Sequence, residues 1–203
     1  MGRPEAVSYS GSTYIAIRSG KHCSSTATSH AVDFDRLLEI QREKIMHNGK
    51  CKPVLVLSVD GGPDENPRYP KVIAHAIDHF QKLDLDALII FTNAPGRSAY
   101  NRVERQMAHL SRELAGVLLP HEFFGSHLDA KGKTIDPELE LRNFAHAGET
   151  LAHVWNGLVI DGHPVKAEYV HPDDTHSVPD LPPPAWYAEH VREGQYVLQV
   201  CIV

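Results

Sequence analysis

Val54-Leu-Val-Leu-Ser-Val59, followed by Asp60-Gly-Gly-Pro63, is the stretch of sequence that decides the fold. A near-continuous apolar run of this length is typical of a strand that is covered on both faces of a sheet. The Gly-Gly-Pro turn ends the strand, because glycine and proline are poor members of a sheet ladder. Asp60 is therefore expected at the open end of a buried strand, where ligands gather in open α/β folds.

The pattern downstream of this turn alternates between helix and strand. Pro70 suits the first turn of a helix, and a second apolar run, Ala87-Leu-Ile-Ile-Phe-Thr92, predicts another buried strand. The helix after Pro70 has an apolar face of Val72, Ile73, Ala76, Ile77 and Phe80. A second helix is predicted from the spacing of Ala99, Val103, Met107, Leu110 and Leu114. Strand, helix, strand and helix in this order predict a parallel α/β arrangement.

The remaining segments complete the expected elements. Tyr14–Ile17 is predicted to be a strand, followed by a Ser- and Gly-rich turn region to Ser29 and a helix capped by Asp33. A helix over residues 137–155 and a strand over residues 165–170 are also expected. Residues 171–185 contain five prolines and indicate an extended linker. The chain ends in an alternating apolar pattern over residues 195–203, which is typical of a strand.

Composition excludes several classes of protein. The chain has 203 residues, a length typical of one domain with an appendage, and its net charge of −6 does not favour a protein that coats nucleic acid. No apolar stretch has the length of a membrane span, and residues 1–6 do not resemble a signal peptide. Its three scattered cysteines suit a reducing, intracellular location. Phosphate-loop, dinucleotide-binding and serine-hydrolase motifs are absent, so no nucleotide cofactor is expected.

Asp60 and Glu104 are the two carboxylates whose positions indicate chemistry. A strand that ends in Asp and a helix that carries Glu are common parts of divalent-metal sites for phosphoryl transfer. The alternative for Asp60 is a residue that caps a tight turn through its side chain. The alternative for Glu104 is an exposed helix residue paired with Arg97 or Arg105.

These motifs resemble the second and third acidic motifs of the DDE transposase and retroviral integrase superfamily. The resemblance covers about Pro53 to Ser111, where Asp60 and its Gly-containing turn precede Asn101-Arg-Val-Glu104-Arg. It implies an RNase H-like mixed sheet flanked by helices, a metal site for Mg²⁺ or Mn²⁺ at Asp60 and Glu104, and Asn101 beside that site. It also implies DNA as the partner, a nuclear location if the source is a eukaryote, and phosphate contacts from Arg97, Arg102 and Arg105. The alternative for these arginines is a solvated helix face.

More loosely, most of the chain is similar to uncharacterised transposon-derived proteins of animal genomes, which implies a longer parent. The first Asp of the superfamily, on an N-terminal hairpin, has no counterpart in residues 7–17. We therefore expect an incomplete core over residues 1–170 with a helical extension, and a Pro-rich tail with a strand over residues 171–203, cut from a longer reading frame. Two carboxylates without the third bind Mg²⁺ poorly, so we expect a relic of a strand-transfer enzyme with little or no nuclease activity.

The fourteen histidines supply two further candidates. His75 and His79 have the spacing of a zinc pair but are predicted to lie on a solvated helix face. His121, His127 and Asp129 are expected in one loop, as a candidate cleft loop, and a metallohydrolase built on these three residues is the weaker alternative function. The main alternative is a non-enzymatic module that binds a protein partner through this loop or through the Pro-rich tail.

Overall fold

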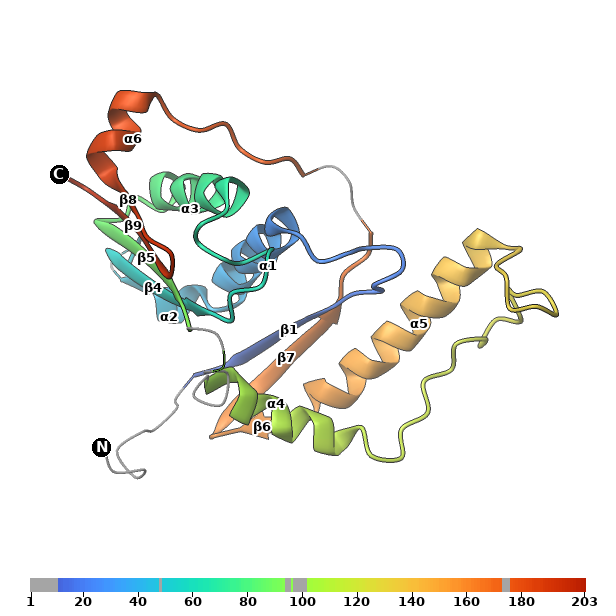
Figure 1. The fold of residues 1–203 in the computed structure, drawn as a ribbon. Helices are drawn as coiled ribbons and strands as arrows, with labels where there is room; N and C mark the ends of the chain where they lie inside the picture. Colours follow the sequence, from blue (N-terminus) through green and yellow to red (C-terminus); the bar gives the residue numbers. More distant parts are fainter. Residues whose placement is uncertain (1–10, 48, 94–95, 97–101, 173–175) are drawn as a thin grey trace. The chain divides into compact units, whose positions relative to one another are not determined.

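The computed structural model describes residues 11–47, 49–93, 96, 102–172 and 176–203, and residues 102–106 only as part of a helix. It is a mixed α/β structure with three sheets and six helices in the described residues. The chain divides into two compact units, each built from two separate segments (Figure 1). Unit 1 comprises residues 1–24 and 102–173, and unit 2 comprises residues 25–101 and 174–203. Within the described residues, no helix is long and apolar enough to cross a membrane.

Unit 2 is organised around a four-stranded mixed sheet in the order β4-β5-β9-β8. Strands β4 (Val54–Val59) and β5 (Ala87–Thr92) pair in parallel, with Val54 opposite Ala87 and Val59 opposite Thr92. Strand β9 (Val197–Cys201) lies antiparallel to β5, and β8 (Val191–Glu193) lies antiparallel to β9. The predicted C-terminal strand therefore forms and is an interior member of this sheet.

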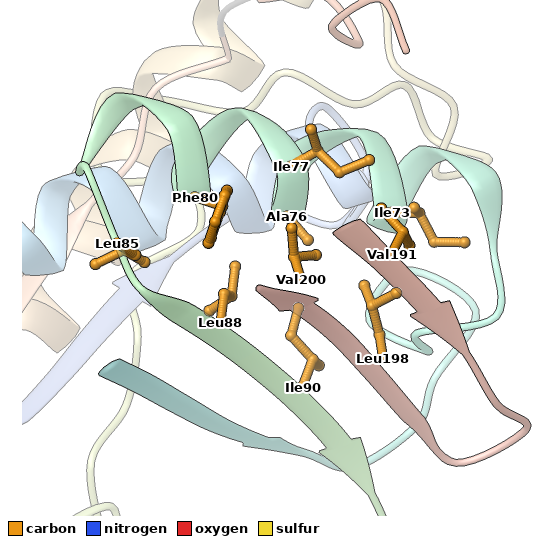
Figure 2. Close-up of a cluster of buried hydrophobic side chains, with 10 residues drawn as sticks. All are labelled: Ile73, Ala76, Ile77, Phe80, Leu85, Leu88, Ile90, Val191, Leu198 and Val200. Atoms are coloured by element: carbon orange, nitrogen blue, oxygen red, sulfur yellow. The ribbon is translucent and has the colours of Figure 1, made fainter. Parts of the chain in front are cut away.

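Helix α3 (Pro70–Lys82) supplies four of the ten buried residues in the core of unit 2. Its apolar face packs on one side of the sheet, as the helical spacing predicts (Figure 2). The buried cluster consists of Ile73, Ala76, Ile77, Phe80, Leu85, Leu88, Ile90, Val191, Leu198 and Val200. Unit 2 also contains α1 (Ala27–Ile40), α2 (Arg42–Ile45), α6 (Pro184–His190) and the short hairpin of β2 (Met46–His47) and β3 (Lys50–Cys51).

Strand β4 departs from its prediction, because only one of its faces is covered. Its residues alternate between exposed and half-buried along the strand. Val54 and Val56 are 50% and 56% exposed, whereas Leu55, Leu57 and Val59 pack against the core. An apolar run alone cannot distinguish a strand covered on both faces from one covered on a single face.

Unit 1 is a helix-on-sheet arrangement. Strands β1 (Thr13–Ile17) and β7 (His163–Tyr169) pair in parallel, and β6 (Val159–Ile160) forms a hairpin with β7. Helix α5 (Pro137–Asn156) packs along β7, and α4 (Arg102–Glu113) contacts α5 (Figure 1). The buried cluster consists of Leu110, Ala152, Trp155, Ile160, Val165 and Ala167.

Candidate functional site

Asp60 follows the last residue of β4 at the carboxyl end of the parallel β4–β5 pair. Because Val59 is opposite Thr92, Asp60 and Asn93 leave the sheet at the same edge. The Asp60 side chain is exposed, and its Oδ1 accepts a hydrogen bond from the Gly62 backbone N–H at 3.0 Å. This contact is the turn-capping role considered as the alternative for Asp60, and it leaves the second carboxylate oxygen free to face solvent.

The turn that carries Asp60 is held against the neighbouring strand. Gly61 has a φ of +88°, a backbone conformation that L side chains rarely adopt. A Cβ atom on Gly61 would also overlap the Thr92 side chain at the end of β5. Two independent reasons thus require glycine here, and together they fix the position of Asp60 at the edge of the sheet.

Two more carboxylates stand beside Asp60 and share one histidine. His30, on α1, has Nε2 at 3.0 Å from Asp64 Oδ2 and Nδ1 at 3.2 Å from Glu65 Oε1. His30 Nε2 also lies 2.7 Å from Ser25 Oγ, so this one ring contacts two carboxylates and a hydroxyl. Asp60, Asp64 and Glu65 thus place three acidic groups at this turn, two of them in contact with His30.

The three carboxylates influence one another. Burial raises the pKa of the Glu65 carboxyl, and the nearby charges of Asp60 and Asp64 raise it further against the opposing effect of His30. For Asp64, burial also acts to raise the pKa, but hydrogen bonds from Ser25, from its own backbone and from His30 outweigh it and lower the pKa below its usual value. Glu65 is thus the member of the cluster that is most readily protonated.

The second predicted metal ligand lies in the other unit. Glu104 is in α4 of unit 1, with its side chain outside the described residues, as are the side chains of Arg102 and Arg105. Arg97 and Asn101 lie wholly outside the described residues. The pairing of Asp60 with Glu104 therefore stays a prediction.

The chemistry of the described donors fits Mg²⁺ only in part. Carboxylate oxygens are the ligands that Mg²⁺ prefers, but His30 engages Asp64 and Glu65, and the turn engages one oxygen of Asp60. Across the described ranges, no three His, Cys, Asp or Glu side chains are grouped in a way that could hold a metal ion. Weak binding of Mg²⁺ or Mn²⁺ at Asp60 stays a prediction.

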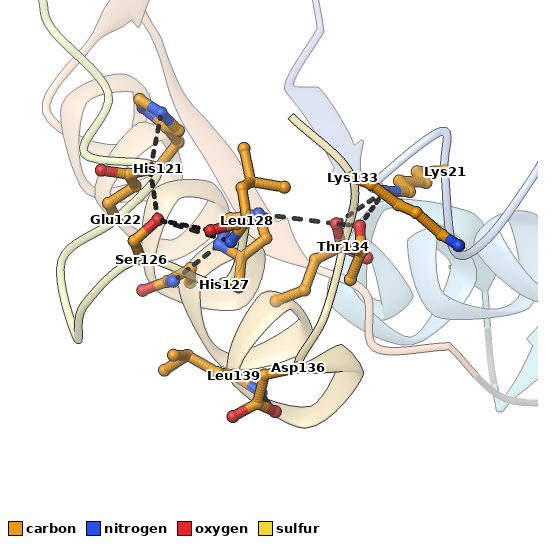
Figure 3. A network of polar contacts seen from close by, with 12 residues as sticks. Lys21, His121, Glu122, Ser126, His127, Leu128, Lys133, Thr134, Asp136 and Leu139 are labelled. Carbon is orange, nitrogen blue, oxygen red and sulfur yellow. Dashed lines mark hydrogen bonds and ion pairs between the residues drawn. The ribbon is translucent and has the colours of Figure 1, made fainter. Parts of the chain in front are cut away.

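The predicted loop of His121, His127 and Asp129 does not converge on one point. The His121 side chain is 70% exposed and lies 3.8 Å from Glu122 Oε1. Asp129 Oδ1 accepts hydrogen bonds from the backbone N–H groups of Lys131 and Lys133 at 2.8 and 2.9 Å, so it caps a turn. Only His127 is buried (Figure 3). The geometry gives no support to a metal centre built on these three residues.

His127 instead joins a buried polar network around Glu140, which the sequence interpretation missed (Figure 3). Glu140 Oε1 accepts hydrogen bonds from Lys21 Nζ at 2.6 Å and from Thr134 Oγ1 at 2.7 Å. His22 Nε2 lies 3.0 Å from Glu140 Oε2. The hydrogen bonds from Lys21 and Thr134 lower the pKa of Glu140 to about 2, so the carboxylate stays charged. This network ties three segments of unit 1 together.

Asn143, one turn after Glu140 on α5, is completely buried with all of its polar atoms paired. Its Oδ1 accepts a hydrogen bond from the Phe124 backbone N–H at 2.9 Å, and its Nδ2 donates to the Gly125 carbonyl at 3.0 Å. The same nitrogen lies 3.1 Å from His127 Nδ1. The sequence held one signal for this network: Glu140 and Asn143 are three residues apart and therefore lie on the same face of an amphipathic helix.

The prediction of a solvated face for His75 and His79 is wrong. Both side chains are buried because α1 packs on this side of α3. His75 Nε2 lies 3.1 Å from Thr28 Oγ1, and His79 Nε2 lies 3.0 Å from Asp35 Oδ1. Burial, followed by the charge of His79, lowers the pKa of His75 and favours its neutral form. The pair serves as the polar part of a helix–helix contact.

Comparison with known proteins gives no relative for this chain: no family model, no curated protein and no solved structure matches it.

Proposed function

We propose that this chain is a relic of a Mg²⁺-dependent DNA strand-transfer enzyme of the DDE type, with an RNase H-like origin, which binds DNA and does not cut it. The observation that carries the proposal is the position of Asp60. It is exposed at the carboxyl end of β4, beside the parallel strand β5, which the Asn-x-x-Glu segment follows in the sequence. The β4–β5 register supports the proposal only through Asp60, which leaves the sheet at the same edge as Asn93.

The expected loss of catalysis follows from the number of carboxylates. Two-metal phosphoryl transfer needs several carboxylates to hold two ions ~3.5–4 Å apart. Asp60 has one oxygen in its own turn, and the neighbouring Asp64 and Glu65 are held by His30. A site of this composition binds a divalent ion weakly and leaves a second ion unsupported.

DNA binding is assigned to the arginines around the Asn-x-x-Glu motif, Arg97, Arg102 and Arg105. The test is the fluorescence anisotropy of a labelled duplex at salt concentrations from 50 to 200 mM. Each phosphate contact contributes roughly 0.9 to the slope of log K against log salt concentration, because it releases a bound counterion. We expect Arg102→Gln and Arg105→Gln each to reduce the slope by about that amount.

Arg36→Gln is the matched control for this experiment, because Arg36 is an exposed helix arginine whose partner is Glu39 at 2.9 Å. Exposed pairs of this kind contribute little to stability. The control should leave the slope unchanged. Two results would contradict the proposal. One is that the duplex does not bind even at 50 mM salt, and the other is that Arg36→Gln changes the slope as much as Arg102→Gln and Arg105→Gln do.

A second candidate function, a protein-interaction module, is favoured by the surface of the 118–135 loop. Five large apolar side chains are exposed there: Leu118, Leu119, Phe123, Phe124 and Ile135. Phe123 stacks on His146 at 3.9 Å between ring centroids, and Arg142 covers the Phe124 ring at 4.6 Å. Exposed apolar groups gathered in this way mark interaction surfaces. Protein association that Phe123→Ser abolishes, in a chain without DNA affinity, would favour this second function.

A further inference from the structure

Unit 2 contains a cavity of about 300 Å³ between α1, α3 and the strands β4 and β5. Its walls are apolar, with Ala31 and Phe34 from α1, Leu57 and Val59 from β4, and Leu88 and Ile90 from β5. A volume of this size is at the lower end of the range for small-molecule sites, which is roughly 300–1,000 Å³. Since one water molecule takes about 30 Å³ of liquid, the cavity suits a molecule of about ten non-hydrogen atoms.

Charged groups line one part of this cavity. His30, Asp64 and Glu65 all contribute to the lining, and the ring of His30 lies within 3.2 Å of both carboxylates. Asp60 adds a third negative charge that acts on Glu65. Lys71 lines a separate hollow that shares Asp64, and among the described residues no ion pair links it to these carboxylates. The charged part of the cavity is therefore negative, and it favours a cation over an anion.

The other polar groups of the cavity are already engaged. His75 faces Thr28, and His79 faces Asp35 and lies edge-on against Phe34 with ring centroids 5.0 Å apart. These contacts join α1 to α3 and leave the apolar walls to determine the shape of the site. A ligand thus needs an apolar body for the walls and one cationic group for Asp64 and Glu65.

We propose that unit 2 binds a small hydrophobic amine in this cavity, with the ammonium group at the Asp64 and Glu65 carboxylates and the apolar body between α1 and β4. An ammonium placed there donates charge-assisted hydrogen bonds to the carboxylate oxygens, next to the contacts that His30 already makes with both groups. The body of the amine removes Leu57, Val59 and Phe34 from contact with water. This site is independent of the proposed DNA-binding function, because it uses none of the arginines assigned to DNA.

The test is a titration of the full chain, labelled at its Ile, Leu and Val methyl groups, with 2-phenylethylamine. Methyl NMR signals of Leu57, Val59 and Ile90 should shift and saturate, while those of Val165 in unit 1 stay in place. The neutral isostere 2-phenylethanol should bind at least tenfold more weakly, and 3-phenylpropanoate should give no saturable shift. Equal affinity for the amine and the alcohol would overturn the assignment, and so would shifts spread over both units.

Two variants locate the site. Glu65→Gln should weaken binding of 2-phenylethylamine at least tenfold, whereas Glu189→Gln, on the exposed part of α6 in the same unit, should leave it unchanged. Ala31→Leu places a larger side chain into the cavity and should abolish binding. Unchanged Leu198 and Val200 methyl signals confirm that each variant is folded, since both residues are fully buried in the core. Retained binding in a folded Ala31→Leu variant would exclude the cavity as the site.

Discussion

Gly61 and Thr92 lie in direct contact, and the turn after β4 has no room for a side chain against the end of β5. The two residues are 31 positions apart in the sequence but adjacent at one edge of the sheet, because Val59 pairs with Thr92. The contact makes the Asp60 turn a rigid continuation of the β4–β5 pair. Stability of unit 2 should therefore be sensitive to the smallest substitution at Gly61.

Gly61→Ala is expected to lower the free energy of unfolding of unit 2 by about 2–5 kcal/mol. The left-handed backbone costs an L residue roughly 1–2 kcal/mol, and overpacking of a tight contact costs roughly 1–3 kcal/mol more. Chemical denaturation, followed by the fluorescence of Trp186 in a Trp155→Phe background, measures the change in unit 2.

Gly49→Ala separates the two contributions. Gly49 also has a positive φ, +80°, but a Cβ atom there would meet no other atom within 4 Å. This variant should lose only the backbone part, about 1–2 kcal/mol. Equal losses at Gly49 and Gly61 would show that the contact with Thr92 is unimportant.

Asp60→Asn is expected to remove a weak Mn²⁺ site without disturbing the turn. An asparagine oxygen can still accept the hydrogen bond from Gly62, but the charge that attracts the ion is lost. In wild type, paramagnetic Mn²⁺ should broaden the amide NMR signals of Gly61 and Gly62 before those of other glycines. The variant should need at least tenfold more Mn²⁺ for the same broadening.

Asp86→Asn is the matched control, because Asp86 is exposed at the opposite end of the same sheet, directly before β5. It should leave the broadening at Gly61 unchanged. Neither the wild type nor Asp60→Asn should nick supercoiled plasmid in Mg²⁺ or Mn²⁺. Nicking by the wild type that Asp60→Asn abolishes would refute the expected loss of catalysis.

Unit 1 should lose stability as the pH falls from about 4.5 to about 2. The folded pKa of Glu140 is about 2 and its ordinary value is 4.5, so the unfolded chain binds a proton in this window before the folded chain does. The contribution of Glu140 is complete above pH 4.5 and is lost towards pH 2. Denaturation midpoints, followed by Trp155 fluorescence in a Trp186→Phe background, should fall accordingly.

Glu140→Gln tests whether this carboxylate is the source of the pH dependence. The variant should be less stable than wild type at pH 6, and its midpoint should vary much less between pH 4.5 and 2. Glu138→Gln, in the same helical turn but exposed, is the control and should keep the dependence of the wild type. An unchanged profile in Glu140→Gln would assign the acid sensitivity to another group.

Asn143→Ala is expected to destabilise unit 1 by about 2–4 kcal/mol. It leaves the Phe124 N–H and the Gly125 carbonyl without their partner, and each of these part-buried bonds is worth roughly 1–2 kcal/mol, the lower part of the range for unsatisfied groups. Asn156, on the same helix, also bonds one backbone N–H and one carbonyl, both of Ala167 at 2.8 Å, but it is exposed. Because Ala167 is 1% exposed, its two backbone groups are also left without a partner away from water, and Asn156→Ala should cost about as much as Asn143→Ala.

Helices and strands were predicted well from the sequence where apolar residues recur at regular spacing or form a continuous run. The helix after Pro70, the helix over residues 137–155 and the strands around Val56 and Ile89 are all confirmed within a few residues. The start of α1 was placed wrongly at Asp33. The helix begins at Ala27, because Thr26 and Ser29 form a reciprocal capping box that the Ser-rich composition concealed as a turn.

Long-range packing explains the other errors. His75 and His79 lie away from the sheet, as their spacing indicates, yet α1 covers them. Nothing in the sequence of α3 specifies that second contact. The polar network of Glu140 was equally hidden, because Lys21, Thr134 and Glu140 meet only once three distant segments are folded together. Asp60, by contrast, is at the end of its strand as predicted, because a single apolar run and a glycine turn determine that position.

The interior place of β9 has a consequence for the order in which the protein can be made. Val197 pairs with Phe91, and β9 separates β5 from β8, so the sheet of unit 2 lacks an inner strand until residues 197–201 have been synthesised. A ribosome-bound chain exposes the free edge of β5 during this time, a state in which unpaired strands are prone to aggregate. Folding of unit 2 is therefore expected to be slow, because its sheet is complete only when β9 pairs with a strand far away in the sequence.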